Sequence, residues 1–308
     1  MAYRHTTVLL HELVDAVFTD PDGIYIDCTL GGAGHTALLL SRLSERGRVI
    51  GVDRDDDALK NAAETVQDAR LILCKSNYSE IAQIAREHAP EGVCGILADL
   101  GISGQQVDDA ERGFSYASDA FLDMRMDRTQ ALTAYDVVNT YSRDELARII
   151  RDYGEERFAG SVADRILRAR EEEPIRTTLA LASVVASALP RQDKKEGHPC
   201  KRTFQAIRIE VNAELSGVET LLEDGVPCLR SGGRMGVISF HSLEDRLVKT
   251  AFARMENPCT CPKDFPVCVC GKKPIARVLT RKPILPSAEE LQANHRAHSA
   301  KLRCCEKL

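Results

Sequence analysis

Short apolar runs alternate with longer amphipathic segments through the first hundred residues. The runs lie at residues 24–26, 49–52, 71–74 and 93–98, and the segments between them repeat apolar side chains at helical spacing. This alternation of strands and helices is typical of a parallel sheet with right-handed crossovers, whose strands are buried on both faces. The sequence therefore predicts an α/β fold of the Rossmann-like type.

Three of the four predicted strands end in a carboxylate. Asp27, Asp53 and Asp99 close the first, second and fourth runs, and Tyr78 follows the third. The carboxyl ends of parallel strands meet at one edge of the sheet, where ligands of such folds bind. We therefore expect these side chains to line a ligand site.

The pattern changes after Asp99. Residues 101–127 are polar and rich in glycine, which predicts a long loop of the kind that usually has a function. Only helical patterns follow from Thr133 to Pro190, one of them opened by the capping-box pair Ser142 and Glu145. We interpret this part as an all-helical insertion of roughly eighty residues between two strands of the sheet.

The sheet resumes late in the chain. After a helical pattern over 202–226, Arg234–Phe240 predicts a fifth strand that follows a Gly-Gly turn. Two final apolar-alternating runs, 277–285 and 300–307, predict a closing hairpin or edge pair. The predicted domains are 1–108 and 209–308 for the two parts of the sheet domain, and 109–208 for the loop with the inserted helical domain.

A glycine-rich loop, D-x-T-x-G-G-A-G-H, follows the first strand and leads into a helical pattern that runs to Arg46. A dinucleotide site would use G-x-G-x-x-G to place a pyrophosphate on a helix N-terminus, whereas here an acid opens the loop. A carboxylate at Asp27 suits a cationic ligand such as S-adenosylmethionine, and Asp53 can accept hydrogen bonds from ribose hydroxyls. A nucleotide-dependent oxidoreductase and a purely structural glycine turn are the alternatives.

Polar residues near two strand ends are candidates for the chemistry. Methyl transfer from a sulfonium needs alignment of donor and acceptor. A base amine is a poor nucleophile, so a carboxylate that accepts from its N–H would help; Asp99 is the candidate, with a structural cap as the alternative. Ser239 and His241 are candidates for positioning roles, with a helix cap by Ser242 and Asp245 as the alternative. A Ser-His-Asp hydrolase is a minor alternative, since geometry defines such a system.

Composition narrows these interpretations. The 308 residues carry a net charge of -5 and are 44% hydrophobic, which is typical of a globular protein and argues against a non-specific nucleic-acid binder. No apolar run approaches the roughly 20 residues of a membrane span, and the first residues lack the features of a signal peptide. We expect a cytoplasmic protein with no membrane partner. Residues 271–308 hold nine Lys or Arg against three Glu, which predicts either a phosphate-binding face or a solvated tail.

Four of the eleven cysteines lie within twelve residues in a Pro-rich stretch. They are Cys259, Cys261, Cys268 and Cys270. Disulfides are rare in a reducing compartment, so these cysteines are either the ligands of a structural zinc ion or free thiols. The C-x-C spacing is tighter than the usual zinc pattern, which leaves both interpretations open.

Several segments together resemble one family. They are HTTVLLHE, DGIYIDCTLGGAGH, VDRD, DLGISGQQVDDAERGFS with LDMRMD, YGEERFA, RTFQAIRIEVNAEL and SGGRMGVISFHSLEDRLVK. In these segments the chain is similar to the bacterial small-subunit ribosomal RNA cytosine-N4 methyltransferases (RsmH or MraW). The resemblance implies a Rossmann-like, S-adenosylmethionine-dependent methyltransferase sheet with an inserted helical domain. Its substrate would be a decoding-centre cytidine of 16S rRNA within the small ribosomal subunit.

The resemblance also implies particular site residues. Cofactor contacts are expected at Ala33, Gly34, His35, Asp53, Tyr78, Asp99 and Gln106. Ala33 stands where glycine is common in the family. We further expect the helical insertion to bracket the RNA with Arg151, Arg157, Arg165 and Arg168, and the target base to leave its stack. A methyltransferase acting on a non-RNA substrate and a non-catalytic assembly factor are the alternatives, and the oligomeric state, monomer or dimer, is open.

Overall fold

The chain forms two compact units. The computed structural model describes residues 7–190, 198–262, 267 and 269–308. One unit, the helical unit, comprises Ile102–Glu214, and the other, the sheet unit, comprises the residues up to Gly101 and Leu215–Leu308. The helical unit is therefore inserted in the sheet unit, and its limits lie a few residues outside the predicted 109 and 208.

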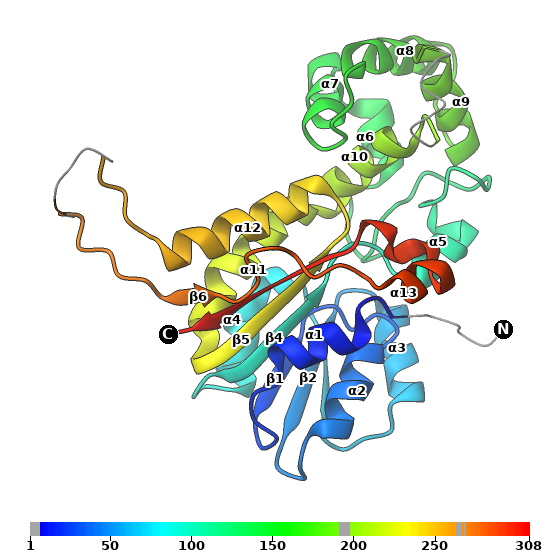
Figure 1. Cartoon of the computed structure of the whole chain (residues 1–308). Helices are drawn as coiled ribbons and strands as arrows, with labels where there is room; N and C mark the ends of the chain where they lie inside the picture. Colours follow the sequence, from blue (N-terminus) through cyan, green and yellow to red (C-terminus); the bar gives the residue numbers. More distant parts are fainter. Residues whose placement is uncertain (1–6, 191–197, 263–266, 268) are drawn as a thin grey trace. The chain divides into compact units, whose positions relative to one another are not determined.

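The sheet unit contains a seven-stranded sheet (Figure 1). Its strands are β1 (Ile24–Asp27), β2 (Arg48–Asp53), β3 (Leu71–Lys75), β4 (Val93–Asp99), β5 (Leu229–Ser239), β6 (Ala276–Val278) and β7 (Lys301–Lys307). Their order is β3-β2-β1-β4-β5-β7-β6, and β7 alone runs antiparallel to its two neighbours. The predicted Rossmann-like α/β fold is confirmed.

Helices cover both faces of this sheet. They are α1 (Leu10–Val17), α2 (Gly34–Arg42), α3 (Asp56–Thr65), α4 (Ile81–His88), α11 (Glu214–Cys228, in this unit from Leu215), α12 (Ser242–Glu256) and α13 (Ala288–Ala293). Ile26 and Ile96 pack on one face with α4, α11 and α12. Their neighbours Tyr25 and Leu97 pack on the other face with α1 and α2. Because successive side chains of a strand point to opposite faces, both positions must be apolar, which explains the uninterrupted apolar runs.

The helical unit has a hydrophobic core of its own. Its helices are α5 (Gly104–Asp108), α6 (Ala134–Thr140), α7 (Arg143–Asp152), α8 (Ala159–Glu172), α9 (Thr178–Ala188) and α10 (Lys201–Asn212), with a 3₁₀ turn, η2, at Ala110–Arg112. Leu122, Ile150 and Phe204 are buried in this core. The predicted capping box of Ser142 and Glu145 opens α7, which confirms that prediction.

Several element boundaries differ from the predictions. The helix α2 ends at Arg42 and not at Arg46, because Leu43 is extended. The predicted Gly-Gly turn lies inside β5, where Gly232 has a φ of +78° and the register with β4 shifts between Val93 and Gly95. Glycine lets the strand bulge there without strain.

Two further boundaries differ. The helical pattern over 202–226 is interrupted at Ala213, which adopts a left-handed conformation and separates α10 from α11. The segment predicted as a long loop after Asp99 contains the short helix α5. The predicted closing pair is confirmed, since β6 and β7 are antiparallel neighbours. Among the described residues, no helix is both long enough and apolar enough to cross a membrane.

Candidate cofactor and methyl-transfer site

Asp27 begins the site at the carboxyl end of β1. Its side chain is buried, and its two oxygens accept hydrogen bonds from Thr36 Oγ1 (2.7 Å) and from the Thr29 backbone N–H (3.2 Å). Burial raises the pKa of Asp27, and the two hydrogen bonds oppose that rise. The order of strands reverses between β1 and β4, which is where open α/β sheets bind their ligands.

The glycine loop after Asp27 has the tight backbone that its sequence predicts. Gly31 and Ala33 have φ values of +44° and +58°. An added Cβ on Gly34 would lie 1.9 Å from Thr7 Oγ1, so glycine is needed where the N-terminal segment crosses the loop. The buried His35 places Nε2 3.1 Å from the Val8 carbonyl oxygen, and it therefore fixes the same segment.

Asp53 faces this loop from the end of β2. One carboxylate oxygen accepts from the Gly31 N–H (2.9 Å) and the other from the Asp55 N–H (3.0 Å). Burial raises the pKa of Asp53 to about 6, although both hydrogen bonds lower it. A carboxylate oxygen has two lone pairs, so each oxygen can still accept from a ribose hydroxyl.

Asp99 ends β4 beside Asp27. Its backbone N–H donates to Thr29 Oγ1 (2.6 Å), while its side-chain Oδ1 is inaccessible and has no hydrogen-bond partner among the described residues. Burial raises the pKa of Asp99 well above its usual range, and the charges of Asp27, Glu244 and Glu290 add to the effect. A buried acceptor without a partner costs stability, and such groups occur where a ligand supplies the missing donor.

Two glutamates complete a group of four acids around Asp99. Glu244 is buried and accepts from the Phe240 and His241 N–H groups at 2.8 and 3.3 Å. Glu290 accepts from the Leu9 N–H at 2.8 Å. The charges of Asp27, Glu244 and Glu290 disfavour ionisation of Asp99, and a cation beside Asp99 would offset this effect, which fits the sulfonium and ammonium groups of S-adenosylmethionine.

Ser239 and His241 have structural contacts in this structure. Ser239 is buried, and its hydroxyl donates to the Lys301 carbonyl of β7 (3.4 Å). His241 is the N-cap of α12 and forms a capping box with Glu244. The alternative cap by Ser242 and Asp245 is wrong by one position, because Ser242 is already the first helical residue.

Two further predicted cofactor contacts come from other elements than Asp27. Tyr78 opens the 3₁₀ turn η1 (Tyr78–Glu80) after β3, and its ring lies so close to Gly217 that an added Cβ there would be 2.9 Å from Cε2. Gln106 belongs to the helical unit, where it is buried and forms the capping box of α5 with Ser103. The sheet unit thus brings together Asp27, Asp53 and Asp99, and Gln106 is held by other elements.

Sequence reasoning did not select some residues of the site. Thr29 and Thr36 anchor Asp27 and Asp99, and their place in the glycine loop was a usable signal. Glu244 lies in the polar stretch directly after the fifth predicted strand, and that position was a usable signal. Glu290 had no local signal, because it lies in a stretch whose sequence reads as basic.

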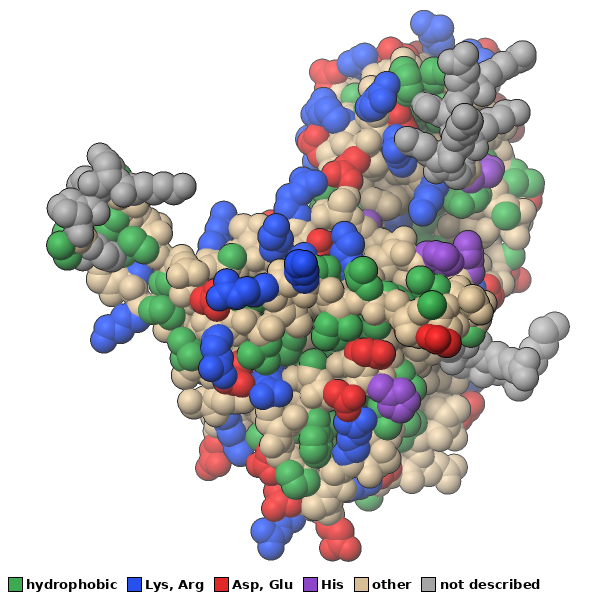
Figure 2. Space-filling view, in the orientation of Figure 1, with side chains coloured by type: hydrophobic (Ala, Val, Ile, Leu, Met, Phe, Trp, Pro, Cys, Tyr) green, Lys and Arg blue, Asp and Glu red, His purple; other side chains and the backbone are tan. Residues whose placement is uncertain are grey.

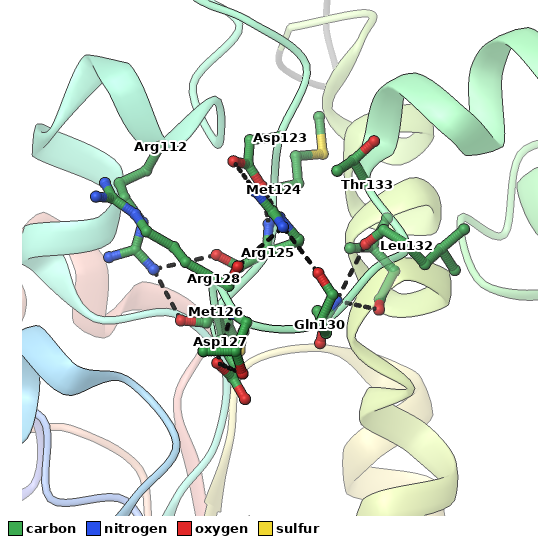
Figure 3. A network of polar contacts seen from close by, with 12 residues as sticks. Arg112, Asp123, Met124, Arg125, Met126, Asp127, Arg128, Gln130, Leu132 and Thr133 are labelled. Atoms are coloured by element: carbon green, nitrogen blue, oxygen red, sulfur yellow. Dashed lines mark hydrogen bonds and ion pairs between the residues drawn. The ribbon is translucent and has the colours of Figure 1, made fainter.

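The LDMRMD segment of the helical unit is fixed by a polar network (Figure 3). The buried Arg112 donates to the carbonyl oxygens of Arg125 (3.1 Å) and Met126 (2.9 Å). Arg125 pairs with Asp123 through two hydrogen bonds of 2.6 and 3.0 Å. The buried Asn212 accepts from the Met126 N–H (2.8 Å) and donates to the Met124 carbonyl (2.7 Å). This segment is therefore a rigid loop within its unit.

Many basic residues of the C-terminal segment form ion pairs. Arg303 is buried and pairs with Asp245 (2.6 Å), Arg277 pairs with Glu306 (2.7 Å), and Lys307 donates to carbonyl groups of the sheet unit. The interpretation as a solvated tail is wrong for 301–307, since β7 lies inside the sheet. Lys272, Lys273, Arg281 and Lys282 remain exposed.

The arginines expected to face RNA lie on the surface of the helical unit. Arg151, Arg157, Arg165 and Arg168 are exposed. Arg165 and Arg168 line a pocket between α8 and α9 together with Asp164 and Ser187. Figure 2 shows the visible face of this unit with Lys and Arg side chains interspersed with acidic ones.

The parallel sheet, the glycine loop after β1 and the acids at the ends of β1, β2 and β4 define an S-adenosylmethionine-dependent methyltransferase. The chain belongs to the MraW methylase family, whose model matches residues 2–308.

Curated relatives match along their whole length. The chain is 49% identical over 309 residues to the "Ribosomal RNA small subunit methyltransferase H" of Clostridium botulinum (strain Kyoto / Type A2), with 100% of both chains covered. It is 50% identical over 311 residues to the protein of the same name from Symbiobacterium thermophilum, with 100% of this chain and 98% of the relative covered. A solved structure of a putative rRNA methylase from Clostridium thermocellum is 15% identical, with a TM-score of 0.47 and coverage of 98% and 99%.

Proposed function

We propose that the protein transfers a methyl group from S-adenosylmethionine to N4 of a decoding-centre cytidine in 16S rRNA of the small ribosomal subunit. The observation that carries the proposal is the buried Oδ1 of Asp99, which lies where the strand order reverses and has no hydrogen-bond partner in the part of the chain that the structure describes. Two whole-length relatives named as small-subunit rRNA methyltransferases support the substrate class. An rRNA substrate also favours the cytoplasm as the place of action.

The sheet unit supplies groups that fit the cofactor. Asp53 would accept hydrogen bonds from the ribose hydroxyls, and the Ala33-Gly34-His35 loop would hold the methionine part. Asp27 would face the cationic end. Tyr78 and Gln106 complete the proposed contacts, with Gln106 and Asp99 toward the adenine and the methyl group.

Bound S-adenosylmethionine would supply an electrophilic methyl group, which the acceptor nitrogen takes as the C–S electron pair returns to sulfur and one N–H proton is lost. Asp99 would accept a hydrogen bond from the exocyclic amine and so orient its lone pair. Burial raises the pKa of Asp99 in the chain alone, and a cation beside Asp99 would favour the ionised carboxylate that accepts this hydrogen bond. His241 and Ser239 would act by positioning, through Glu244 and through β7 respectively.

The helical unit would contact the RNA. Four of its exposed arginines, Arg151, Arg157, Arg165 and Arg168, offer charged hydrogen-bond donors to phosphates. Specific RNA recognition usually targets unstacked nucleotides, so the target cytidine is expected to be extruded.

The test is a methyl-transfer assay with tritiated S-adenosylmethionine and small subunits from a strain that lacks the enzyme, followed by nucleoside analysis. Label in N4-methylcytidine is the expected result. Label in another nucleoside would reject the N4 target, and label in protein would favour a non-RNA substrate. Bound cofactor without any label would favour an assembly factor.

The Asp99→Ala variant tests the role of the carboxylate in the same assay. Loss of the hydrogen-bond acceptor should lower the turnover rate on assembled subunits by about 10²-fold or more. Full activity of this variant would contradict the positioning role.

A further inference from the structure

The described residues between α12 and β6 form no apolar core of their own. Between Glu256 and Ala276 the described residues form neither helix nor strand. Val267 and Val269 are 71% and 73% exposed. In Figure 1 the segment extends from the ends of α12 and β6 as a long excursion, drawn in orange, and Figure 2 shows hydrophobic side chains on its surface. Burial of apolar side chains therefore does not hold this excursion in place.

Three cysteines from the two arms of the excursion come together. The sulfur atoms of Cys259, Cys261 and Cys270 all lie within 4.8 Å of one another. Cys261 and Cys270 are half-buried although the surrounding valines are exposed. The Val269 backbone N–H points at Cys261 Sγ across 3.3 Å. This hydrogen bond joins the two arms of the excursion at the cysteine cluster.

The donor set identifies the class of ion. Thiolates alone favour zinc and disfavour magnesium or calcium, which prefer oxygen ligands. Tetrahedral zinc with Zn–S bonds of about 2.3 Å requires sulfur atoms about 3.8 Å apart, so a contraction of at most about 1 Å would complete the geometry. A disulfide would join two of the sulfurs and leave the third unused.

We propose that Cys259, Cys261 and Cys270 bind one structural Zn²⁺ ion, which fixes the two arms of the excursion to each other. Cys268, the fourth cysteine of the predicted ligand set, lies outside the described residues. The three thiols lose their protons to solvent on binding, and a fourth donor completes the tetrahedral shell. The binding free energy then stabilises a segment that has no core. This zinc site lies outside the methyl-transfer machinery, so its existence does not depend on the proposed function.

The first experiment measures metal content. The full chain, expressed with zinc and purified without chelator, is expected to hold about one zinc per chain by elemental analysis. Cys259→Ser, Cys261→Ser and Cys270→Ser should each lower zinc content by about tenfold or more. Cys74→Ser and Cys228→Ser are matched controls, because these half-buried cysteines lie outside the excursion, and they should leave the zinc content unchanged.

A second experiment needs no variant and therefore does not depend on folding of the substituted chains. Zinc is exchanged for Co²⁺ in the full chain, and the visible spectrum is expected to show the intense bands of tetrahedral thiolate coordination. Limited proteolysis should cut between Glu256 and Ala276 many times faster after chelation than before.

Three outcomes would overturn the proposal. They are absence of both zinc and cobalt binding, purification with iron in place of zinc, and cleavage rates that chelation does not change. Retention of zinc in all three cysteine variants would equally reject this ligand set.

Discussion

Asp53 is a half-buried acid whose protonation can be followed through cofactor binding. Its pKa is raised to about 6 by burial, and its carboxylate is the proposed acceptor for ribose hydroxyls. Affinity for S-adenosylmethionine should therefore fall as pH is lowered through about 6, by up to about tenfold per pH unit below that value. Binding calorimetry across this range checks the prediction.

The Asp53→Asn variant separates this group from the other acids. It should bind the cofactor more weakly than the wild type at neutral pH and should lack the inflection near pH 6. The stability of the fold depends on this ionisation with the opposite sign from cofactor affinity, because it falls as pH rises. Because the pKa in the fold lies above the ordinary 3.8, ionised Asp53 costs stability increasingly as pH rises from about 4 to about 6. An unchanged inflection in the variant would assign it to another carboxyl group.

Gly34 tests the close approach of the N-terminal segment to the glycine loop. Gly34→Ala places a Cβ 1.9 Å from Thr7 Oγ1 and 3.0 Å from Thr7 Cβ, so the segment must move. We expect cofactor affinity to fall by about tenfold or more, since displacement of about 1 Å is costly at such sites. The Thr7→Ala and Gly34→Ala double variant removes the nearest atom and should recover part of the loss. Strictly additive losses would show that the two residues are not coupled.

Ala33 adopts a backbone conformation in the glycine loop that favours glycine. Its φ of +58° lies in the left-handed region, where a side chain costs about 1 to 2 kcal/mol relative to a right-handed conformation. Glycine has no such cost. The methyl group of Ala33 is buried against Leu30 and Ala62, and this burial offsets part of the strain.

At the scale of elements, the side-chain amide of Asn212 holds the backbone of the LDMRMD loop. Asn212 in α10 satisfies the Met126 N–H and the Met124 carbonyl, and Met124 has a φ of +57°. Asn212→Ala leaves both buried groups unpaired and should lower the free energy of unfolding of the helical unit by about 3 kcal/mol. Hydrogen exchange at Met126 should accelerate in parallel.

Asn139 provides the matched control for this prediction. It also bridges backbone groups, through Tyr135 and Ile175, but it is half-buried, so water can replace the lost contacts. Asn139→Ala should cost about 1 kcal/mol and leave exchange at Met126 unchanged. Equal effects of the two substitutions would contradict a specific role of Asn212.

The elements were predictable to different degrees. The strands β1 to β4 were identifiable because each is a local apolar run that ends at a turn or an acid. The position of β7 between β5 and β6 was not, since strand pairing across long stretches of chain leaves no local pattern. For the same reason, the sequence did not indicate Glu290, whose hydrogen bond to Leu9 joins positions 281 residues apart. Asp27, Asp53 and Asp99 were predictable because topology alone brings strand ends together.

At the scale of the whole molecule, the two units have separate hydrophobic cores. We expect two thermal transitions by calorimetry. S-adenosylmethionine at about 100 times its dissociation constant should stabilise the sheet unit by about 2.7 kcal/mol and shift only its transition. Leu122→Ala should lower the free energy of unfolding of the helical unit by about 2 to 5 kcal/mol, and its thermal transition should therefore move to a lower temperature.

Leu221→Ala is the matched substitution in the sheet unit, because Leu221 is equally buried there. Leu221→Ala should lower the transition temperature of the sheet unit and leave the transition temperature of the helical unit unchanged. A single transition that responds to both substitutions and to the cofactor would show that the units unfold together.

The discontinuous sheet has a consequence for synthesis on the ribosome. The strand β4 emerges before the whole helical unit, whereas its neighbour β5 emerges after it, and β7 emerges later still. During translation the helical unit can close its core while one edge of β4 still lacks its partner. An exposed strand edge invites pairing with other chains. The time needed to synthesise the inserted unit therefore determines how long the free edge of β4 can pair with other chains. Faster folding of the inserted unit would not shorten that time.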